Sequence, residues 1–268
     1  MEIVFGIAHY NRFELLSLCL GFFDNLDFQK VGITVKINLY DDMSDKEEYD
    51  AFVSTNRHRF HRVIRNKKNK GSTGNIYNMY TDFLENETAK FFFNLDSDLV
   101  VSEAFPRVLM NFLKSEIGHI SFYNSSSHGR KTLGILCYEP VVSKEHLGSA
   151  GTLFSRQCLA DIITNVPCRE IAFDWDWSKY LIQSGKIIYC TYRSYFLHIG
   201  FNGDNNSLSN LNNGFDRALN FYFSRKEKLK PTFKELQSYL SRHNVSERNL
   251  VVNSLRFYLQ IFFVWIKA

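Results

Sequence analysis

The sequence predicts an α/β protein in which a mixed β-sheet is flanked by helices, with a helical tail at the C-terminus. Three observations lead to this prediction. Apolar runs of strand length alternate with stretches of helical periodicity along residues 1–110. Several of these runs end abruptly in polar or acidic residues. From about residue 213 the pattern becomes helical and basic.

The first predicted unit is a strand, a helix and a second strand. Residues 2–8 (EIVFGIA) are apolar enough for a buried strand, a helical pattern covers residues 13–23, and a second strand covers residues 32–40. Units of this kind bring the carboxyl ends of their strands to one edge of the sheet, where ligands bind. A polar turn follows the first strand: His9, Tyr10, Asn11 and Arg12.

The second strand ends in two carboxylates, Asp41 and Asp42. At the edge of the sheet such residues are well placed to accept hydrogen bonds from a nucleoside base or ribose. They also suit a turn and the N-cap of the helix that we expect to begin at Lys46. The sequence leaves both interpretations open.

A basic stretch over residues 57–70 leads into the glycine-bearing residues 71–75 (GSTGN) and a helix predicted over residues 76–84. Glycines ahead of a helix N-terminus let backbone N–H groups approach an anion. This stretch is therefore a candidate diphosphate contact, with a solvated face or a polyanion site as alternatives. Neither G-x-x-x-x-G-K nor G-x-G-x-x-G is present.

Residues 91–101 (FFFNLDSDLVV) read as a buried strand that carries Asp96 and Asp98 at its end. The period of two along a strand turns both carboxylates to the same side. They repel each other unless they share a cation, and a hard divalent ion such as Mn²⁺ or Mg²⁺ suits oxygen ligands. His198 would add a nitrogen ligand. The alternatives are an acidic turn and a histidine buried in the core.

The second half of the chain mixes shorter strands, over residues 118–123, 132–138 and 187–192, with helices. The segment around Gly151 contains small residues, which permit close approach by a ligand or by another backbone segment. At the start of a helix, residues 173–177 read FDWDW. Trp175 and Trp177 are candidates for a flat surface against sugar rings, with core packing as the alternative.

Composition limits the class of protein. Hydrophobic residues make up 45% and aromatic residues 16% of the chain, which excludes extensive disorder. A formal net charge of +4 argues against a dedicated nucleic-acid binder. The five cysteines show no zinc-binding spacing and favour a reducing compartment, and the N-terminus has no secretory-signal pattern. We therefore expect a cytoplasmic protein.

Taken in order, these motifs resemble GT-A glycosyltransferases, and most closely the large inverting family 2. The likeness covers about the first two hundred residues. His9 stands where that family usually has Thr. The segments that match are IVFGIAHYNR, LYDDMSD, FNLDSDLVV, GSAGTLFSR and FDWDWSKYL.

The resemblance implies a role for each motif. The turn after the first strand and either Asp41 or Asp42 would contact the nucleotide. Asp96 would contact the ribose, and Asp98 would hold the metal together with Asp96 and His198. Lys70 and Asn75 would lie at the diphosphate, Gly151 on the acceptor side. Asp174 would act as general base, with Asp176 second.

The chain departs from the family pattern at two places, and one segment is similar to another family. Phe173 replaces the usual acid before the general base, and Gly74-Asn75 replaces Arg-Asn, so that Lys70 or a neighbour would supply the positive charge. Residues 198–200 (HIG) resemble the H-x-G of retaining family 8 enzymes without its following Lys. This segment leaves retention of configuration open as an alternative to inversion.

The implied function is transfer of a sugar from a nucleotide-sugar donor, most simply a UDP-sugar, to a hydroxyl of a glycan or lipid-linked acceptor. Synthesis of a bacterial surface polysaccharide or glycoconjugate is the implied setting. The alternatives are a retaining family 8-like transferase, a haloacid-dehalogenase-type phosphatase, for which D-S-D-L-V also fits, and a GT-A-like protein that only binds a sugar or a partner.

We expect three regions: residues 1–110 for the nucleotide sugar, residues 111–212 for the acceptor and residues 213–268 as a basic helical extension. Residues 221–268 hold nine Lys or Arg against three Glu. The final apolar residues are interrupted and too short to span a bilayer. An interfacial helix on the inner face of the membrane is one interpretation. A helix that docks on the catalytic domain, or on a second subunit of a homodimer, is the other.

Overall fold

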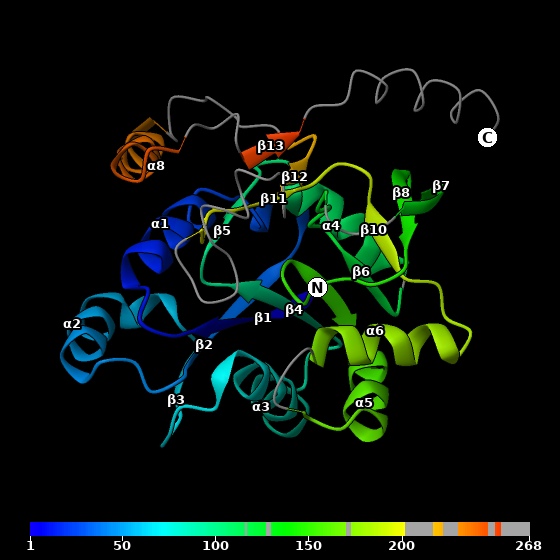
Figure 1. Ribbon diagram of the computed structural model, residues 1–268, viewed down its shortest axis with the longest axis horizontal. Helices are drawn as coiled ribbons and strands as arrows, with labels where there is room; N and C mark the ends of the chain where they lie inside the picture. Colours follow the sequence, from blue (N-terminus) through cyan, green and yellow to red (C-terminus); the bar gives the residue numbers. More distant parts are fainter. Residues whose placement is uncertain are drawn as a thin grey trace.

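The computed structural model describes residues 1–115, 117–126, 130–169, 173–201, 217–221, 230–245 and 250–252. Its main feature is a nine-stranded mixed sheet in the order β3-β2-β1-β4-β9-β6-β10-β8-β7 (Figure 1). The strands are β1 (Glu2–His9), β2 (Thr34–Asp41), β3 (Arg62–Arg65), β4 (Phe91–Asp96), β6 (His119–Ser121), β7 (Arg130–Leu136), β8 (Glu139–Lys144), β9 (Thr152–Ser155) and β10 (Tyr189–Thr191).

One half of the sheet is parallel. Strand β1 pairs with both β2 and β4, and β2 pairs with β3. The register places His9 opposite Asp41, Asp41 opposite Arg65, and Ala8 opposite Asp96. Because the apolar stretches of β1 and β4 are buried on both faces, their polar ends can emerge only at this edge. The sheet thus gathers the polar residues that the sequence places after separate strands.

The other half is mostly antiparallel. Strand β9 pairs antiparallel with β4 and β6, β10 runs parallel to β6, and the hairpin of β7 and β8 completes the sheet. A two-stranded sheet of β5 (Leu99–Val101) and β11 (Phe196–His198) lies beside it. Strands β12 (Ala218–Leu219) and β13 (Val251–Val252) form a third sheet.

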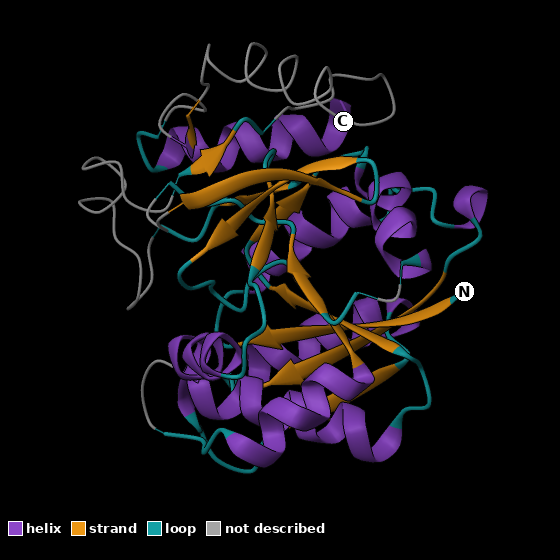
Figure 2. Cartoon of the chain, turned by 90° about the vertical axis from the view of Figure 1, so that its right-hand side faces the viewer, coloured by secondary structure: helices purple, strands orange, loops and turns teal. Residues whose placement is uncertain are grey.

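Helices cover both faces of the main sheet (Figure 2). Two separate apolar cores contain the buried side chains of the two helix groups. One group packs with the core around Phe5: α1 (Phe13–Phe23), α2 (Lys46–Asn56), α4 (Phe105–Lys114) and α8 (Lys230–Arg242). The other packs with the core around Phe92: α3 (Gly71–Asn86), α5 (Arg156–Asn165) and α6 (Phe173–Gln183). Short 3-10 helices cover Gln29–Val31 and Arg57–Arg59.

The sequence-based boundaries agree with the structure for α1 and need correction elsewhere. The single strand predicted over residues 91–101 is wrong, because β4 ends at Asp96 and β5 belongs to a different sheet. Asp98 therefore lies in the turn between them. The glycine-bearing residues 71–75 form the first turn of α3 instead of a loop before it. The basic stretch contains a strand, β3, that the sequence analysis did not predict.

The described part of the C-terminal extension packs on the domain formed by the main sheet. The ring of Phe233 in α8 meets Phe22 of α1 edge-on, with 5.4 Å between centroids, and Arg242 forms an ion pair with Glu14. The interfacial helix was predicted over residues 249–268, but Val251 and Val252 form β13, and residues 253–268 lie outside the described residues. Within the described ranges, none of the helices combines the length and apolar character needed to span a bilayer.

Candidate active site

Asp98 lies at the centre of the polar edge. Its side chain is only 6% exposed, and its two oxygens face different partners. Oδ2 accepts a hydrogen bond from Arg12 Nη1 at 2.9 Å, and Oδ1 lies 3.1 Å from Nε2 of His198. Arg12 comes from the turn after β1 and His198 from the end of β11, which pairs with Leu99 of β5. Three segments far apart in sequence therefore meet at one carboxylate.

The residues after His198 wrap closely around Asp98. The backbone N–H of Ile199 donates to the Asp98 carbonyl oxygen at 3.0 Å. A Cβ at Gly200 would lie 1.9 Å from Asp98 Oδ2, far inside van der Waals contact. Only glycine therefore fits beside this carboxylate, which gives the HIG segment a local structural reason.

Asp96 shares the edge with Asp98. Its Oδ1 accepts a hydrogen bond from Asn94 Nδ2 at 2.7 Å. Burial, and then the negative charge of Asp98, raise the pKa of Asp96 to about 7. Two carboxylates crowded in this way are stabilised in their ionised forms by a cation.

The predicted metal ligands are brought together in part. Within the described ranges no three His, Cys, Asp or Glu side chains are arranged to hold a metal ion. Asp98 and His198 are nevertheless in contact, Asp96 lies two residues before Asp98, and the guanidinium of Arg12 already places a positive charge on Asp98. Two carboxylates and an imidazole are ligands of the kind that Mn²⁺ accepts. The chemical types of these side chains thus suit a divalent cation, and in this structure the guanidinium of Arg12 contacts Oδ2 of Asp98.

Asp41 and Asp42 are both held by the protein itself. Asp41 is buried and accepts hydrogen bonds from the hydroxyl and the N–H of Ser44, and Arg65 Nε lies 3.3 Å from its Oδ2. Burial raises the pKa of Asp41 above its ordinary value. Asp42 Oδ1 accepts from Asn66 Nδ2 at 2.8 Å and from the N–H of Lys70 at 2.9 Å. These carboxylates shape the end of β2 and fix the start of α3.

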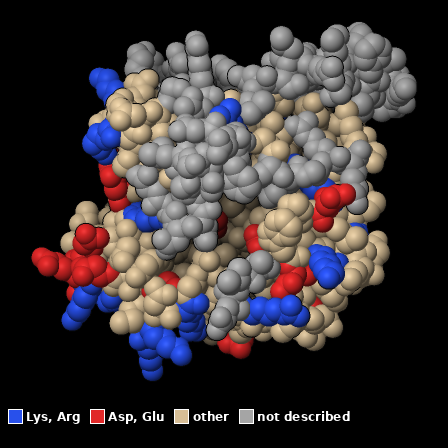
Figure 3. All heavy atoms as spheres, viewed as in Figure 1, with Lys and Arg blue, Asp and Glu red and all other residues tan. Residues whose placement is uncertain are grey.

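The start of α3 carries Lys70 and Asn75 in different roles. Asn75 is buried, and its Nδ2 donates to the Tyr40 carbonyl oxygen at 3.0 Å while its Oδ1 accepts from Asn66. Its amide is therefore engaged within the fold. Lys70 is exposed and donates to Asn78 Oδ1 from its ammonium group. Lys67 and Lys68 are exposed beside it, and basic side chains lie along the lower edge of the face in Figure 3.

The turn after β1 is tied to the end of β2. Asn11 has a positive φ of 48°, its N–H donates to the Ser44 hydroxyl at 2.9 Å, and its Oδ1 accepts from the N–H of Asp45 at 2.7 Å. Asn tolerates this left-handed conformation better than most residues. Tyr10, next to it, is 45% exposed and free to contact a ligand.

His9 is buried at the end of β1, with its ring 4.4 Å from the ring of Phe13. Among the described residues, neither of its ring nitrogens has a hydrogen-bond partner. Burial, and then the positive charge of Arg12, lower the pKa of His9 to about 3. The imidazole is therefore neutral, with one donor and one acceptor unused at the edge of the sheet.

Asp174 approaches the same edge from the opposite face of the sheet. It lies in the first turn of α6, and its Oδ1 accepts from the N–H of Trp175 at 3.0 Å. Burial raises the pKa of Asp174, and the charge of Asp174 contributes in turn to the raised pKa of Asp96. The carboxylate of Asp176 lies 3.8 Å from Arg169 Nε, a surface partner. Of the two predicted bases, Asp174 has the closer electrostatic link to Asp96.

The residues predicted to contact the acceptor differ in how exposed they are. Trp175 is 54% exposed and stacks on the His146 ring, with 3.9 Å between centroids. Trp177 is 0% exposed and packs edge-on against Phe154, so the prediction that it contacts an acceptor is wrong. Gly151 is buried and has a φ of +65°, a backbone conformation that favours glycine. A Cβ at this position would also lie only 3.1 Å from Tyr123 Cβ. Its glycine has a packing reason that requires no ligand.

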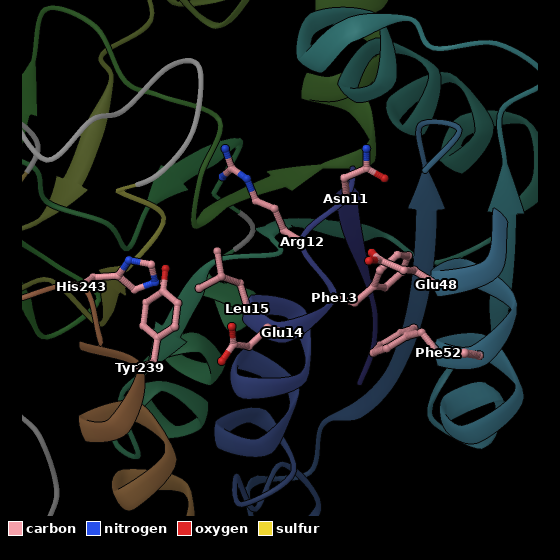
Figure 4. A pocket seen from close by; sticks show the side chains of 10 residues that line it. Asn11, Arg12, Phe13, Glu14, Leu15, Glu48, Phe52, Tyr239 and His243 are labelled. Carbon is pink, nitrogen blue, oxygen red and sulfur yellow. The ribbon is translucent and has the colours of Figure 1, made fainter. Parts of the chain in front are cut away.

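A pocket of about 600 Å³ lies next to Arg12 (Figure 4). It opens between three helices: the N-terminus of α1, α2, and α8. Tyr239 of α8 and His243, which follows α8, form one wall, and Phe13, Glu48 and Phe52 form the other. Sequence reasoning missed Tyr239 and His243, since neither belongs to a motif. It also missed Arg65 and Asn66, although both follow a strand in the same way as Asp41 and Asp42 do.

Comparison with known proteins was informative only at the level of structure. No protein-family profile and no curated protein sequence matches the chain. The S. aureus TarS 1-349 structure superposes with a TM-score of 0.50 at 15% identity, over 73% of this chain and 60% of that one. Its complex with UDP-GlcNAc gives a TM-score of 0.51 at 13% identity, over 73% and 58%.

The structure of GalNAc-T7 with UDP, GalNAc and Mn²⁺ gives a TM-score of 0.52 at 11% identity, over 71% of this chain and 42% of that one. The chain thus spans 60% or less of the length of these proteins. Similarity at such low identity is evidence for architecture. Together with the parallel strands β3-β2-β1-β4 and the Asp96 and Asp98 pair at their edge, it shows that this chain has the GT-A fold.

Proposed function

We propose that this chain is a glycosyltransferase that moves a sugar from a nucleotide-sugar donor to a hydroxyl group of a glycan or lipid-linked acceptor. The observation that carries the proposal is the meeting of Arg12, Asp98 and His198 at the carboxyl end of β4 in a GT-A fold. This is the edge at which open α/β sheets bind ligands. The cluster combines carboxylate, imidazole and guanidinium groups, which suits a charged diphosphate and its counterion.

The donor would lie across the ends of β1, β2 and β4. Tyr10 is exposed there, and His9 offers an unused donor and acceptor. Exposed Lys70 at the start of α3 would meet the diphosphate and supply the positive charge that the family pattern takes from an Arg, where this chain has Gly74. UDP is the first nucleotide to test, because the TarS and GalNAc-T7 structures contain UDP or a UDP-sugar.

Asp96, Asp98 and His198 would hold Mn²⁺ or Mg²⁺. When bound, the ion would neutralise the negative charge that develops on the departing diphosphate. The GalNAc-T7 structure contains Mn²⁺, which supports the choice of ion. Arg12 would give up Oδ2 of Asp98 and remain close enough to balance the charge of the phosphate groups.

Asp174 would take the proton of the acceptor hydroxyl. The acceptor oxygen forms a bond to the anomeric carbon as the bond from that carbon to the diphosphate oxygen breaks, and the nucleoside diphosphate leaves. A raised pKa brings a carboxylate closer to the range in which a general base is effective. Asp174 and Asp96 approach the edge from different elements, which favours attack from the far side and inversion. Exposed Trp175, stacked on His146, would support the acceptor sugar.

A binding screen tests this proposal. Thermal unfolding of the wild type would be followed with UDP-, GDP- and CMP-sugars, with and without Mn²⁺, beside Asp98→Asn and the control Asp161→Asn. Asp161 is a surface residue that binds Lys186 and Tyr180. We expect metal-dependent stabilisation by one nucleotide sugar in the wild type and in the control, and its loss in Asp98→Asn. Stabilisation by none of the ligands would refute the proposal.

The biological setting follows from the tail and the fold. A basic, apolar C-terminal extension suits work close to an anionic membrane surface, where lipid-linked acceptors lie. We therefore propose a role in the synthesis of a bacterial surface glycan, with peripheral contact to the inner face of the membrane. Incubation with a synthetic lipid-linked acceptor, followed by mass spectrometry of the product, would test this assignment.

A further inference from the structure

The helix α8 touches the back of the segment that surrounds Asp98. Residues 198–200 face Asp98 on one side, as described above. On the other side, the hydroxyl of Tyr239 in α8 donates a buried hydrogen bond of 3.4 Å to the carbonyl oxygen of Ile199. Tyr239 and Ile199 are 40 positions apart in sequence, and neither the fold nor the D-x-D motif requires this contact.

Ile199 is consequently held from two directions. Its N–H donates to the Asp98 carbonyl oxygen at 3.0 Å, and its own carbonyl oxygen accepts from Tyr239. Its neighbours in sequence, His198 and Gly200, both lie against the Asp98 carboxylate. Displacement of Ile199 would therefore move both of these contacts at once.

An aromatic cluster reinforces the hydrogen bond. Phe201 is buried and packs its ring against Tyr239 and against His243, each with 5.5 Å between centroids. The rings of Tyr239 and His243 are 4.8 Å apart. Figure 4 shows the side chains of Tyr239 and His243 on the wall of the pocket that Arg12 also lines. Aromatic contacts of this kind stabilise the packing beyond what the buried area alone contributes.

The helix itself is anchored well enough to act as a support. Leu236 and Leu240 are buried in the core shared with α1, and the ion pair between Arg242 and Glu14 adds a second contact with α1. Burial, and then the negative charge of Asp98, raise the pKa of Tyr239 to about 12. Its hydroxyl therefore keeps its proton and remains a donor at neutral pH.

We propose that Tyr239 is a positioning residue, which holds His198 and Gly200 against Asp98 through Ile199 and Phe201. The C-terminal extension then contributes to the active site, besides any role at a membrane. This inference rests on the proposed function for its catalytic meaning, since His198 and Asp98 are the groups assigned to the metal ion. The positioning itself is a property of the protein without ligands.

Hydrogen–deuterium exchange on the full-length protein without ligands tests the positioning. The matched variants are Tyr239→Phe, which removes only the hydroxyl, Tyr239→Leu, which also removes the ring, and the control Tyr180→Phe. Tyr180 donates to Asp161 at 2.8 Å on the opposite face of the sheet and touches none of the residues around Asp98. In Tyr239→Phe we expect exchange over residues 196–201 to become about two- to tenfold faster, because this is the change that the loss of one hydrogen bond causes.

Tyr239→Leu should show a larger effect in the same residues, while β1 exchanges as in the wild type. Unchanged exchange over residues 196–201 in both Tyr239 variants would overturn the inference. So would equally faster exchange in β1 and β4, which would indicate only general destabilisation.

Mn²⁺ affinity, measured from the electron paramagnetic resonance signal of the free ion, links the positioning to function. We expect Tyr239→Leu to weaken Mn²⁺ binding by about tenfold, as loss of a supporting contact around a metal site does. A wild type that binds no Mn²⁺ would count against the proposed metal site, and the exchange result would still stand. A wild type and a Tyr239→Leu variant that bind Mn²⁺ equally would refute the link between α8 and the site.

Discussion

Side chains of the same kind have different surroundings in this protein, and burial decides what each can do. Asp41 and Asp42 are occupied by Ser44, Arg65 and Asn66, whereas Asp98 faces groups that a ligand could replace. Trp175 and Trp177 differ in the same way, although only one residue separates them in α6. Substitutions of single residues are therefore compared with substitutions of chemically matched residues.

The two tryptophans give the first comparison. Trp177→Ala should lower the free energy of unfolding by about 3–5 kcal/mol, because it leaves a cavity beside Phe154. Trp175→Ala should change it by no more than about 0.5 kcal/mol, because the side chain is mostly exposed. Sugar transfer by Trp175→Ala should fall while donor hydrolysis persists. Urea unfolding and product analysis measure both, and full transfer activity in Trp175→Ala would remove this residue from the acceptor site.

Gly200 gives the second comparison. A methyl group at Gly200 would push into the Asp98 carboxylate, so Gly200→Ala should weaken metal-dependent nucleotide binding by about tenfold or more. Gly134→Ala, in β7, is the control, since a Cβ there meets no atom within 4 Å. Calorimetric titration with UDP and Mn²⁺ measures the affinity. Equal affinities in the two variants would show that the close packing around Asp98 is unimportant for binding.

The elements of the fold determine where these residues meet. The end of β4 at Asp96 lets the chain turn, so that Asp98 points to Arg12 and His198 instead of continuing the strand. Strand β11 reaches this turn by pairing with β5. Strand β6, deeper in the sheet, contains His119, which is buried and uncharged and has no part in the site.

Because His119 is buried, it makes the stability of the fold depend on pH. Burial lowers the pKa of His119 from 6.5 to about 4, so between these values the unfolded chain binds a proton that the folded chain does not. The free energy of unfolding therefore falls as the pH decreases from about 6.5 towards 4. His119 accounts for about 2 kcal/mol of this loss by pH 5.

His119→Leu should remove this share of the loss, whereas His58→Leu, at an exposed position, should not. Urea unfolding at pH 7 and at pH 5 measures the difference. If His119→Leu lost as much stability as the wild type over this interval, the assignment to His119 would be incorrect.

For the molecule as a whole, apolar periodicity and strand-end carboxylates are local features, and they predicted the α/β class and the polar edge at Asp96 and Asp98. Helix α1 is the clearest case, with identical predicted and observed bounds. The GT-A fold was predicted from the resemblance of the motifs to that family. The partners of Asp98 could not be derived locally, since the pairing of β11 with β5 and the turn at Arg12 are long-range contacts. Trp177 was misassigned because the sequence around it does not reveal which side of α6 faces the core.

Two roles were predicted for the C-terminal extension, docking on the domain and contact with a membrane, and they apply to different parts of it. The α8 part contacts the domain, and the apolar end remains a candidate for membrane contact. Deletion of residues 253–268 should therefore reduce flotation with vesicles that contain anionic lipid. The deletion should leave the melting temperature unchanged, because α8 and its contacts with the domain remain. Equal flotation of the full chain and the shortened chain would contradict the membrane role of this end.

Release of nucleoside diphosphate from UDP-sugars in the presence of Mn²⁺ tests the central claim most directly. It would be measured for the wild type, Asp98→Asn and Asp161→Asn, all confirmed as folded. We predict metal-dependent release of UDP from one donor by the wild type and the control, accelerated by an acceptor glycan and abolished in Asp98→Asn. Release that is equal in Asp98→Asn, or absent with every donor although the wild type binds UDP and Mn²⁺, would contradict the proposal that this edge of the sheet catalyses sugar transfer.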